Sequence, residues 1–155
     1  MPTTRVSRTI SASADELWDV VSDPHHLPRW WPRVNRVESV EQDAFTEVLS
    51  TSSGKLVRAD FELLESDEQS RWLRWSQCVD GTPFARLLSA AETFVSLKQS
   101  SFTDPHQAGQ VTDVTIELRQ SIRGFFPRFG SRMMRRAAAA TLEEALDGLE
   151  RIVGR

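Results

Sequence analysis

The spacing of apolar residues changes twice along the chain, and each change marks a different kind of element. Residues 3–11 alternate around Val6, which is typical of a strand. Residues 14–22 then carry apolar side chains at helical spacing, behind a capping box formed by Ser13 and Glu16. The sequence therefore predicts a first strand that is followed by a short helix.

Prolines delimit a second short helix. The residue before a proline avoids the helical region, so Asp23–Pro24 ends the first helix. Pro24 suits the first turn of a helix that runs through residues 27–30, and Pro32 closes it.

After Pro32 the period changes from 3.6 to 2. We expect six strands, over residues 34–42, 45–51, 56–65, 71–79, 92–99 and 111–122. In the third of these six strands Phe61 and Leu63 share an apolar face, whereas Asp60 and Glu62 share a polar one. A strand with one apolar and one polar face predicts an antiparallel sheet that is covered on one side only.

The cover is a long amphipathic helix predicted over residues 127–152. Its apolar stripe consists of Met134, Ala138, Leu142, Ala145, Leu146, Leu149 and Val153. Consecutive strands without crossover helices pair as antiparallel meanders, so this helix must lie across the concave apolar face of a curved sheet. The prediction is a single α+β domain over residues 1–155, with two short helices after the first strand.

Several segments resemble the START-like (SRPBCC) superfamily, and in particular its polyketide cyclase/dehydrase-type domains. The resemblance rests on Ile10–Trp18, Val20–Pro24 and Leu27–Pro32, supported by Gly81–Leu88 and the terminal amphipathic helix. It covers nearly the whole chain and implies a helix-grip fold, with a cavity between the long helix and the sheet. The superfamily hosts carriers, aromatase/cyclases, coenzyme-Q-binding proteins and chaperone activators, so the resemblance implies no single function.

A cavity also follows from the pattern alone, because a curved sheet that grips one helix leaves a gap for large side chains or a guest. The small residues 137–140 either let the helix sit close to the sheet or leave room for a ligand. The residues expected to point inward include almost no ionisable group. This favours ligand binding over acid–base catalysis and predicts that binding depends little on pH. The predicted ligand-binding residues are Trp31, Phe61, Leu63, Trp75, Gln77, Phe84, Val95, Val114, Ile116, Met134 and Ala138.

Composition narrows the classes of partner. The net charge is −3, which argues against a nucleic-acid-binding protein. The sequence shows no signal peptide and no apolar stretch long enough to span a membrane. The single cysteine, Cys78, rules out an intramolecular disulfide, so a cytoplasmic location is expected.

Reactive residue types are few. His25 and His26 are adjacent on a helix and diverge by about 100°, so they do not converge on one metal ion. His106 is interpreted as a loop residue and Cys78 as a small strand residue rather than a nucleophile. We expect no metal site and no cofactor, because no cluster or nucleotide motif is present.

Arginines gather at the start of the long helix, interleaved with phenylalanines. The group includes Arg128, Arg132, Arg135 and Arg136. Positive charge at a helix N-terminus opposes the macrodipole, so contact with an anionic tail, membrane surface or acidic partner is one interpretation. A solvated face is the other.

Three functions fit these observations. The first is non-enzymatic binding of a small lipophilic molecule in an internal hydrophobic cavity. The second is a polyketide cyclase or dehydratase, and the third is a protein-interaction module that uses its surface. A polar group with a partner inside the cavity favours the second function, and a filled cavity favours the third.

Overall fold

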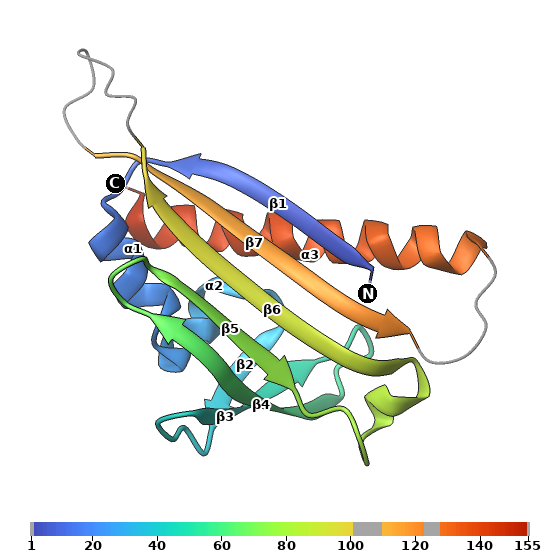
Figure 1. Cartoon of the computed structure of the whole chain (residues 1–155). Coiled ribbons are helices and arrows are strands. Elements are labelled where there is room, and N and C mark those ends of the chain that lie inside the picture. The colour runs from blue at the N-terminus through green and yellow to red at the C-terminus, as the bar shows by residue number, and fades with distance from the viewer. Residues whose placement is uncertain (1, 101–109, 123–127, 155) are drawn as a thin grey trace.

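Seven strands form one antiparallel sheet in the order β1-β7-β6-β5-β4-β3-β2 (Figure 1). The structure is a computed structural model that describes residues 2–100, 110–122 and 128–154, without the side chains of 128–131. The elements are β1 (Thr3–Ile10), α1 (Ala14–Val21), η1 (Pro24–His26), α2 (Leu27–Trp30), β2 (Val34–Glu38), β3 (Ala44–Ser50), β4 (Leu56–Asp67), β5 (Trp72–Gln77), η2 (Pro83–Arg86), β6 (Leu88–Gln99), β7 (Thr112–Ile122) and α3 (Arg128–Val153).

The predicted architecture is confirmed. α3 lies across one face of the curved sheet and contacts β1, β7, α1 and α2 (Figure 1). The order of a strand, short helices, six strands and a long helix is the predicted one. The Ser13 side chain accepts a hydrogen bond from the Glu16 amide at 3.1 Å, as expected of an N-cap.

Strand ends differ from the predicted boundaries where the backbone turns. β2 ends at Glu38 rather than at residue 42, because Ser39 adopts a left-handed φ of 51°. β5 begins after Arg71, whose φ is 53°. β6 begins at Leu88, four residues earlier than predicted, because Leu88 pairs with Ile122 across a register shift.

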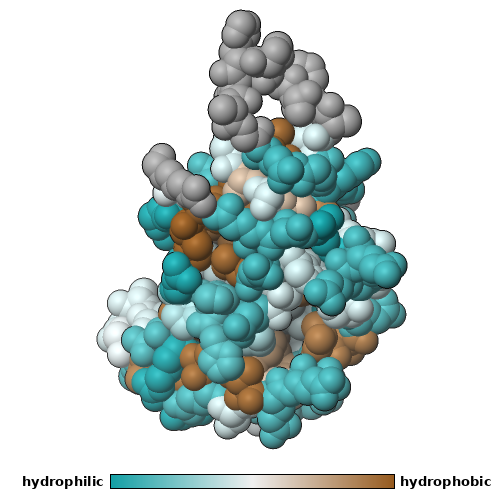
Figure 2. All heavy atoms as spheres, turned by 90° about the vertical axis from the view of Figure 1, so that its left-hand side faces the viewer, coloured by the Kyte–Doolittle hydropathy of each residue, from teal (hydrophilic) through white to brown (hydrophobic). Residues whose placement is uncertain are grey.

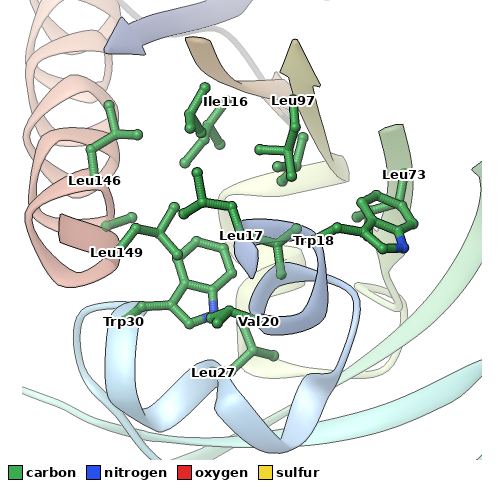
Figure 3. Packing of buried hydrophobic residues seen from close by; sticks show 14 of the residues in the cluster. Leu17, Trp18, Val20, Leu27, Trp30, Leu73, Leu97, Ile116, Leu146 and Leu149 are labelled. Atoms are coloured by element: carbon green, nitrogen blue, oxygen red, sulfur yellow. The ribbon is translucent and has the colours of Figure 1, made fainter. Parts of the chain in front are cut away.

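The closed part of the core lies under the C-terminal half of α3. Leu146 and Leu149 from α3 and Trp30 from α2 point toward Leu17 of α1 (Figure 3). All four side chains are buried. Trp18 is buried in the same cluster, as the sequence predicts.

An ion network holds the same half of α3 against β1. The Arg8 guanidinium donates hydrogen bonds of 2.6 Å to both Glu143 and Asp147 on α3. It also lies 3.3 Å from the Glu150 carboxylate. Hydrophobic side chains reach the surface at this end of the molecule only as separate small areas among hydrophilic ones (Figure 2). Over the described residues, no helix has the length and apolar character that crossing a bilayer requires.

The two helices α2 and α3 approach each other at Gly148. A Cβ atom at this position would lie 2.6 Å from the Cα of Trp30 and closer still to its carbonyl oxygen. Such a contact is with backbone, so relief requires one helix to move. Glycine is therefore needed here for its missing side chain.

Gly148→Ala is expected to lower the free energy of unfolding by about 1–3 kcal/mol, the usual range for overpacking. Helix propensity alone predicts the opposite, a gain of about 1 kcal/mol from replacing a helical glycine by alanine. Urea denaturation followed by circular dichroism measures the net change. Glu144→Ala, at an exposed site on the same helix, is the control and should have little effect. A more stable Gly148→Ala protein would contradict the close approach.

Candidate functional site

A cavity of about 650 Å³ lies between the N-terminal half of α3 and the inward faces of strands β3 to β7. The C-terminal half of α3 is packed on β1, α1 and α2, so the sheet and the helix separate only toward the start of α3. Ala137 and Ala138 line the cavity, and their small side chains leave the space open. Of the two interpretations of residues 137–140, the structure therefore supports room for a ligand.

The cavity opens where η2 and the first turns of α3 lie. Leu87, directly after η2, lines the cavity and is 53% exposed. Ala137 on α3 also lines the cavity and is exposed. Thr51 and Ser52, in the turn after β3, also line the cavity and are exposed. Exposed lining residues on three separate elements place an entrance between them.

Seven of the predicted site residues line this cavity. They come from the segment after α2, from β4, β5 and η2, and from α3. These residues are Trp31, Phe61, Trp75, Gln77, Phe84, Met134 and Ala138. Ligand binding by these residues stays a prediction, but the structure brings them together around one space.

The other four predicted residues lie elsewhere. Val95, Val114 and Ile116 are on the inward face but are fully buried in the closed core, where α1 and α3 cover the sheet. Leu63 lies beside a smaller depression next to residues 41–45. Strand alternation identifies the inward face correctly, yet it does not show which rows of that face the helices cover.

Aromatic side chains form one wall of the cavity. Trp31 and Trp75 meet edge to face with ring centroids 6.3 Å apart, and Phe45 stacks on Phe61 at 5.2 Å. Trp30, in contrast, is buried in the core. Of the two adjacent tryptophans, one is therefore packed inside and the other lines the cavity. These ring contacts stabilise the wall beyond the burial of its apolar area.

Glu47 is the unexpected member of the site. Its side chain lies on the inward face of β3, lines the cavity and is only 3% exposed. Burial raises the pKa of its carboxyl from 4.5 to about 8. The expectation of a pocket with almost no ionisable group is therefore wrong at this position.

A signal for Glu47 exists in the sequence, although it is ambiguous. Phe45, Glu47 and Leu49 share one phase of β3, and two of these three residues are apolar. Val48 belongs to the opposite phase and is also fully buried. With apolar residues on both phases, alternation alone does not decide which way the carboxyl points.

Other polar side chains also line the cavity, among them Ser50 and Thr141. Gln77 has a buried amide nitrogen, Nε2, without a hydrogen-bond partner among the described residues. Thr93 is buried, and Gln120 lies on the same row of the sheet as Gln77, with Ala91 between them. Arg33 also lines the cavity, but its side chain is exposed. Apart from Gln77, these residues are not among the predicted ligand-binding residues.

The remaining candidate residues lie away from the cavity. His25 is exposed, and its ring nitrogen lies 2.8 Å from the Asp23 carboxylate at the start of η1. Among the described residues, no three His, Cys, Asp or Glu side chains are close enough to hold a metal ion. His106 lies outside the described residues.

Cys78 does not have the properties of a nucleophile. Burial raises the pKa of its thiol, and the negative charges of Glu62 and Asp60 raise it further. The reactive thiolate is therefore disfavoured. This agrees with the interpretation of Cys78 as a small strand residue.

Comparisons with known proteins agree with this geometry. The family described as "Polyketide cyclase / dehydrase and lipid transport" matches residues 1–154. No curated protein matches the chain.

Solved structures with the same fold include XoxI from Bacillus cereus (14% identity, TM-score 0.74, 98% of this chain and 95% of that one). A START superfamily protein from Mycobacterium smegmatis matches with 15% identity and a TM-score of 0.72, over 96% of this chain and 94% of that one. The di-domain ARO/CYC protein BexL of the BE-7585A biosynthetic pathway matches with 20% identity and a TM-score of 0.76. That match covers 99% of this chain but 46% of BexL, so the chain spans about half of that protein. At these identities the likeness shows the fold alone.

Proposed function

The chain belongs to the polyketide cyclase/dehydrase and lipid transport family, and from this premise we propose that it binds a small lipophilic molecule in the cavity under α3. The observation that carries the proposal is the cavity of about 650 Å³ with its aromatic and aliphatic walls. Ligand pockets commonly measure about 300–1,000 Å³ and are lined mainly by apolar side chains with few polar groups. The principal driving force is burial of the ligand's apolar surface, at about 25 cal/mol per Å².

Filling the cavity from α3 tests this proposal. Ala138→Phe places a ring in the cavity, and we expect it to weaken binding of an environment-sensitive hydrophobic dye at least about tenfold, equivalent to about 1.4 kcal/mol. Ala140→Phe is the matched control, because Ala140 belongs to the same run of alanines but is exposed and does not line the cavity. Fluorescence titration measures both affinities, and circular dichroism confirms that both proteins are folded. Equal binding by the two variants would place the dye elsewhere.

A second candidate function is acid–base catalysis on a polyketide-like substrate. Glu47 favours it, because a carboxyl whose pKa is about 8 can both give and take a proton near neutral pH. BexL, a di-domain ARO/CYC protein, has the same fold. Deuterium exchange at the carbon next to the carbonyl of a bound ketone distinguishes the two functions. Exchange that requires Glu47 indicates catalysis, and its absence indicates binding alone.

The contact expected near the arginines of α3 stays a prediction. Arg132, Arg135 and Arg136 are exposed on the first turns of α3, close in sequence to the cavity residues Met134 and Ala137. This location supports contact between the entrance and an anionic surface. The side chain of Arg128 lies outside the described residues. A reducing cytoplasmic compartment, proposed from the single cysteine, also stays a prediction.

A further inference from the structure

The Glu47 carboxyl is buried, and the part of the chain that the structure describes offers it no bonding partner. Its neighbours in the sheet are Val37 on β2 and Ala59 on β4, and neither side chain is polar. Among the described residues, none forms a hydrogen bond or ion pair with the carboxyl. An isolated carboxylate is very unfavourable in such a site, so the group is held as the neutral acid. A neutral carboxyl has one O–H donor, and the cavity is the space available to it.

Gln77 provides a second donor on the same wall. Its Nε2 atom is buried and has no hydrogen-bond partner in the described parts of the chain, and the residue lines the cavity. In the sheet register, Glu47 lies opposite Ala59 while Gln77 lies opposite Phe61, two residues farther along β4. Glu47 on β3 and Gln77 on β5 therefore extend from the same face of the sheet, on the two strands that flank β4. Leaving a buried donor without a hydrogen bond is unfavourable by about 1–3 kcal/mol. A ligand atom that accepts this hydrogen bond removes the penalty.

The charges around the cavity limit what the ligand can carry. The described lining side chains on β4, β5, β6, β7, η2 and α3 are all uncharged. Arg33, before β2, is the one described cation on the lining, and its side chain is exposed. An anionic ligand group would therefore find no buried partner. Buried hydrogen-bond donors without a buried cation suit a neutral oxygen acceptor.

We propose that the ligand is an uncharged lipophilic molecule with a carbonyl oxygen, which accepts a hydrogen bond from the protonated Glu47 carboxyl while Gln77 offers a second donor. This inference rests on the proposed function, because it assigns the polar recognition point of the same cavity. It also makes binding depend on pH. The complex needs the proton, so affinity falls as Glu47 ionises.

Two probes that differ in one group test the inference. The first is the fluorescent ketone 6-propionyl-2-(dimethylamino)naphthalene, and the second is its 6-propyl analogue, in which a methylene replaces the carbonyl. We expect the ketone to bind about threefold to tenfold more tightly at pH 7, as one hydrogen bond allows. Between about pH 7 and about pH 9 the ketone should lose about tenfold in affinity, with a midpoint near the pKa of Glu47 of about 8. The propyl analogue should not change.

Three variants distinguish the role of the Glu47 proton from the roles of the other groups in the cavity. Glu47→Gln keeps an N–H donor at every pH, so the preference for the ketone should persist while its pH dependence disappears. Glu47→Leu removes this donor and leaves only Gln77 to bond the carbonyl, so the preference for the ketone should become smaller and its pH dependence should disappear. Gln77→Leu should weaken ketone binding a few-fold without moving the midpoint.

The outcomes distinguish this inference from the proposed function. If neither probe binds, or if both bind equally to the wild-type and Ala138→Phe proteins, the proposed function fails. If both probes bind in the cavity but with equal affinity and no dependence on pH, only the role of Glu47 is wrong. Tighter binding of the permanently charged trimethylammonium form of the propyl probe, increasing with pH, would mean that Glu47 recognises a cation instead. That result also overturns the inference.

Discussion

Glu47→Gln is expected to stabilise the ligand-free protein by about 4 kcal/mol at pH 8 and by less than about 1 kcal/mol at pH 5. The pKa of the Glu47 carboxyl is about 8 in the folded protein, against an ordinary value of 4.5. Below pH 4.5 the carboxyl holds its proton in both states, so ionisation does not oppose folding. As the pH rises from 4.5 to 8, the unfolded chain loses the proton while the folded protein keeps it, and stability falls. Above pH 8 the folded protein ionises too, and the loss levels off.

Urea denaturation across this pH range measures the free energies of unfolding of the wild-type and Glu47→Gln proteins. In their difference the contributions of all other titrating groups cancel. Glu144→Gln is the control, because it makes the same chemical change at an exposed site on α3. Parallel stability curves for the wild-type and Glu47→Gln proteins would mean that the carboxyl is solvated rather than buried.

Trp75→Ala is expected to lower the free energy of unfolding by about 3 kcal/mol, at the lower end of the range of about 3–5 kcal/mol for large aromatic residues in cores. Trp75 is 4% exposed and meets both Trp31 and Phe45 edge to face. It also lines the cavity, so one side of the ring already lacks packing partners and fewer contacts are lost.

Trp72→Ala is the matched control for this substitution. Trp72 lies on the same strand but on the opposite face, where it is half-buried against Phe94 at 5.8 Å. Its loss should have a smaller effect, about 1–2 kcal/mol. Urea midpoints followed by circular dichroism compare the two variants. If Trp75→Ala is no more destabilising than Trp72→Ala, the assignment of the inward face of β5 is wrong.

The sequence predicts the elements of this fold well because their signals are local. The capping box at Ser13, the stop at Asp23–Pro24 and the alternation of β4 each depend on residues within a few positions of one another. The strand ends at Ser39 and Arg71 are predicted less well. There a non-glycine residue adopts a left-handed φ, which no local pattern marks.

The site is only partly predictable for a different reason. Alternation places Phe61, Trp75 and Val95 on one face, yet the first two line the cavity and the third is sealed in the core. The difference is where α3 packs closely against its neighbours. Gly148 lets the C-terminal half of the helix pack against α2, whereas the small residues 137 and 138 leave a cavity between the other half and the sheet.

The sequence by itself therefore determined the order of the elements and the inward face of most strands, since both follow from short-range periodicity. Its motifs also resemble those of the family whose model matches residues 1–154. Only the tertiary structure decided the extent of the cavity and the environment of Glu47. Both depend on distances between elements that are far apart in the chain. A glutamate on a strand with apolar residues on both faces becomes an acid with a pKa near 8 only when the assembled sheet and helix exclude water from it.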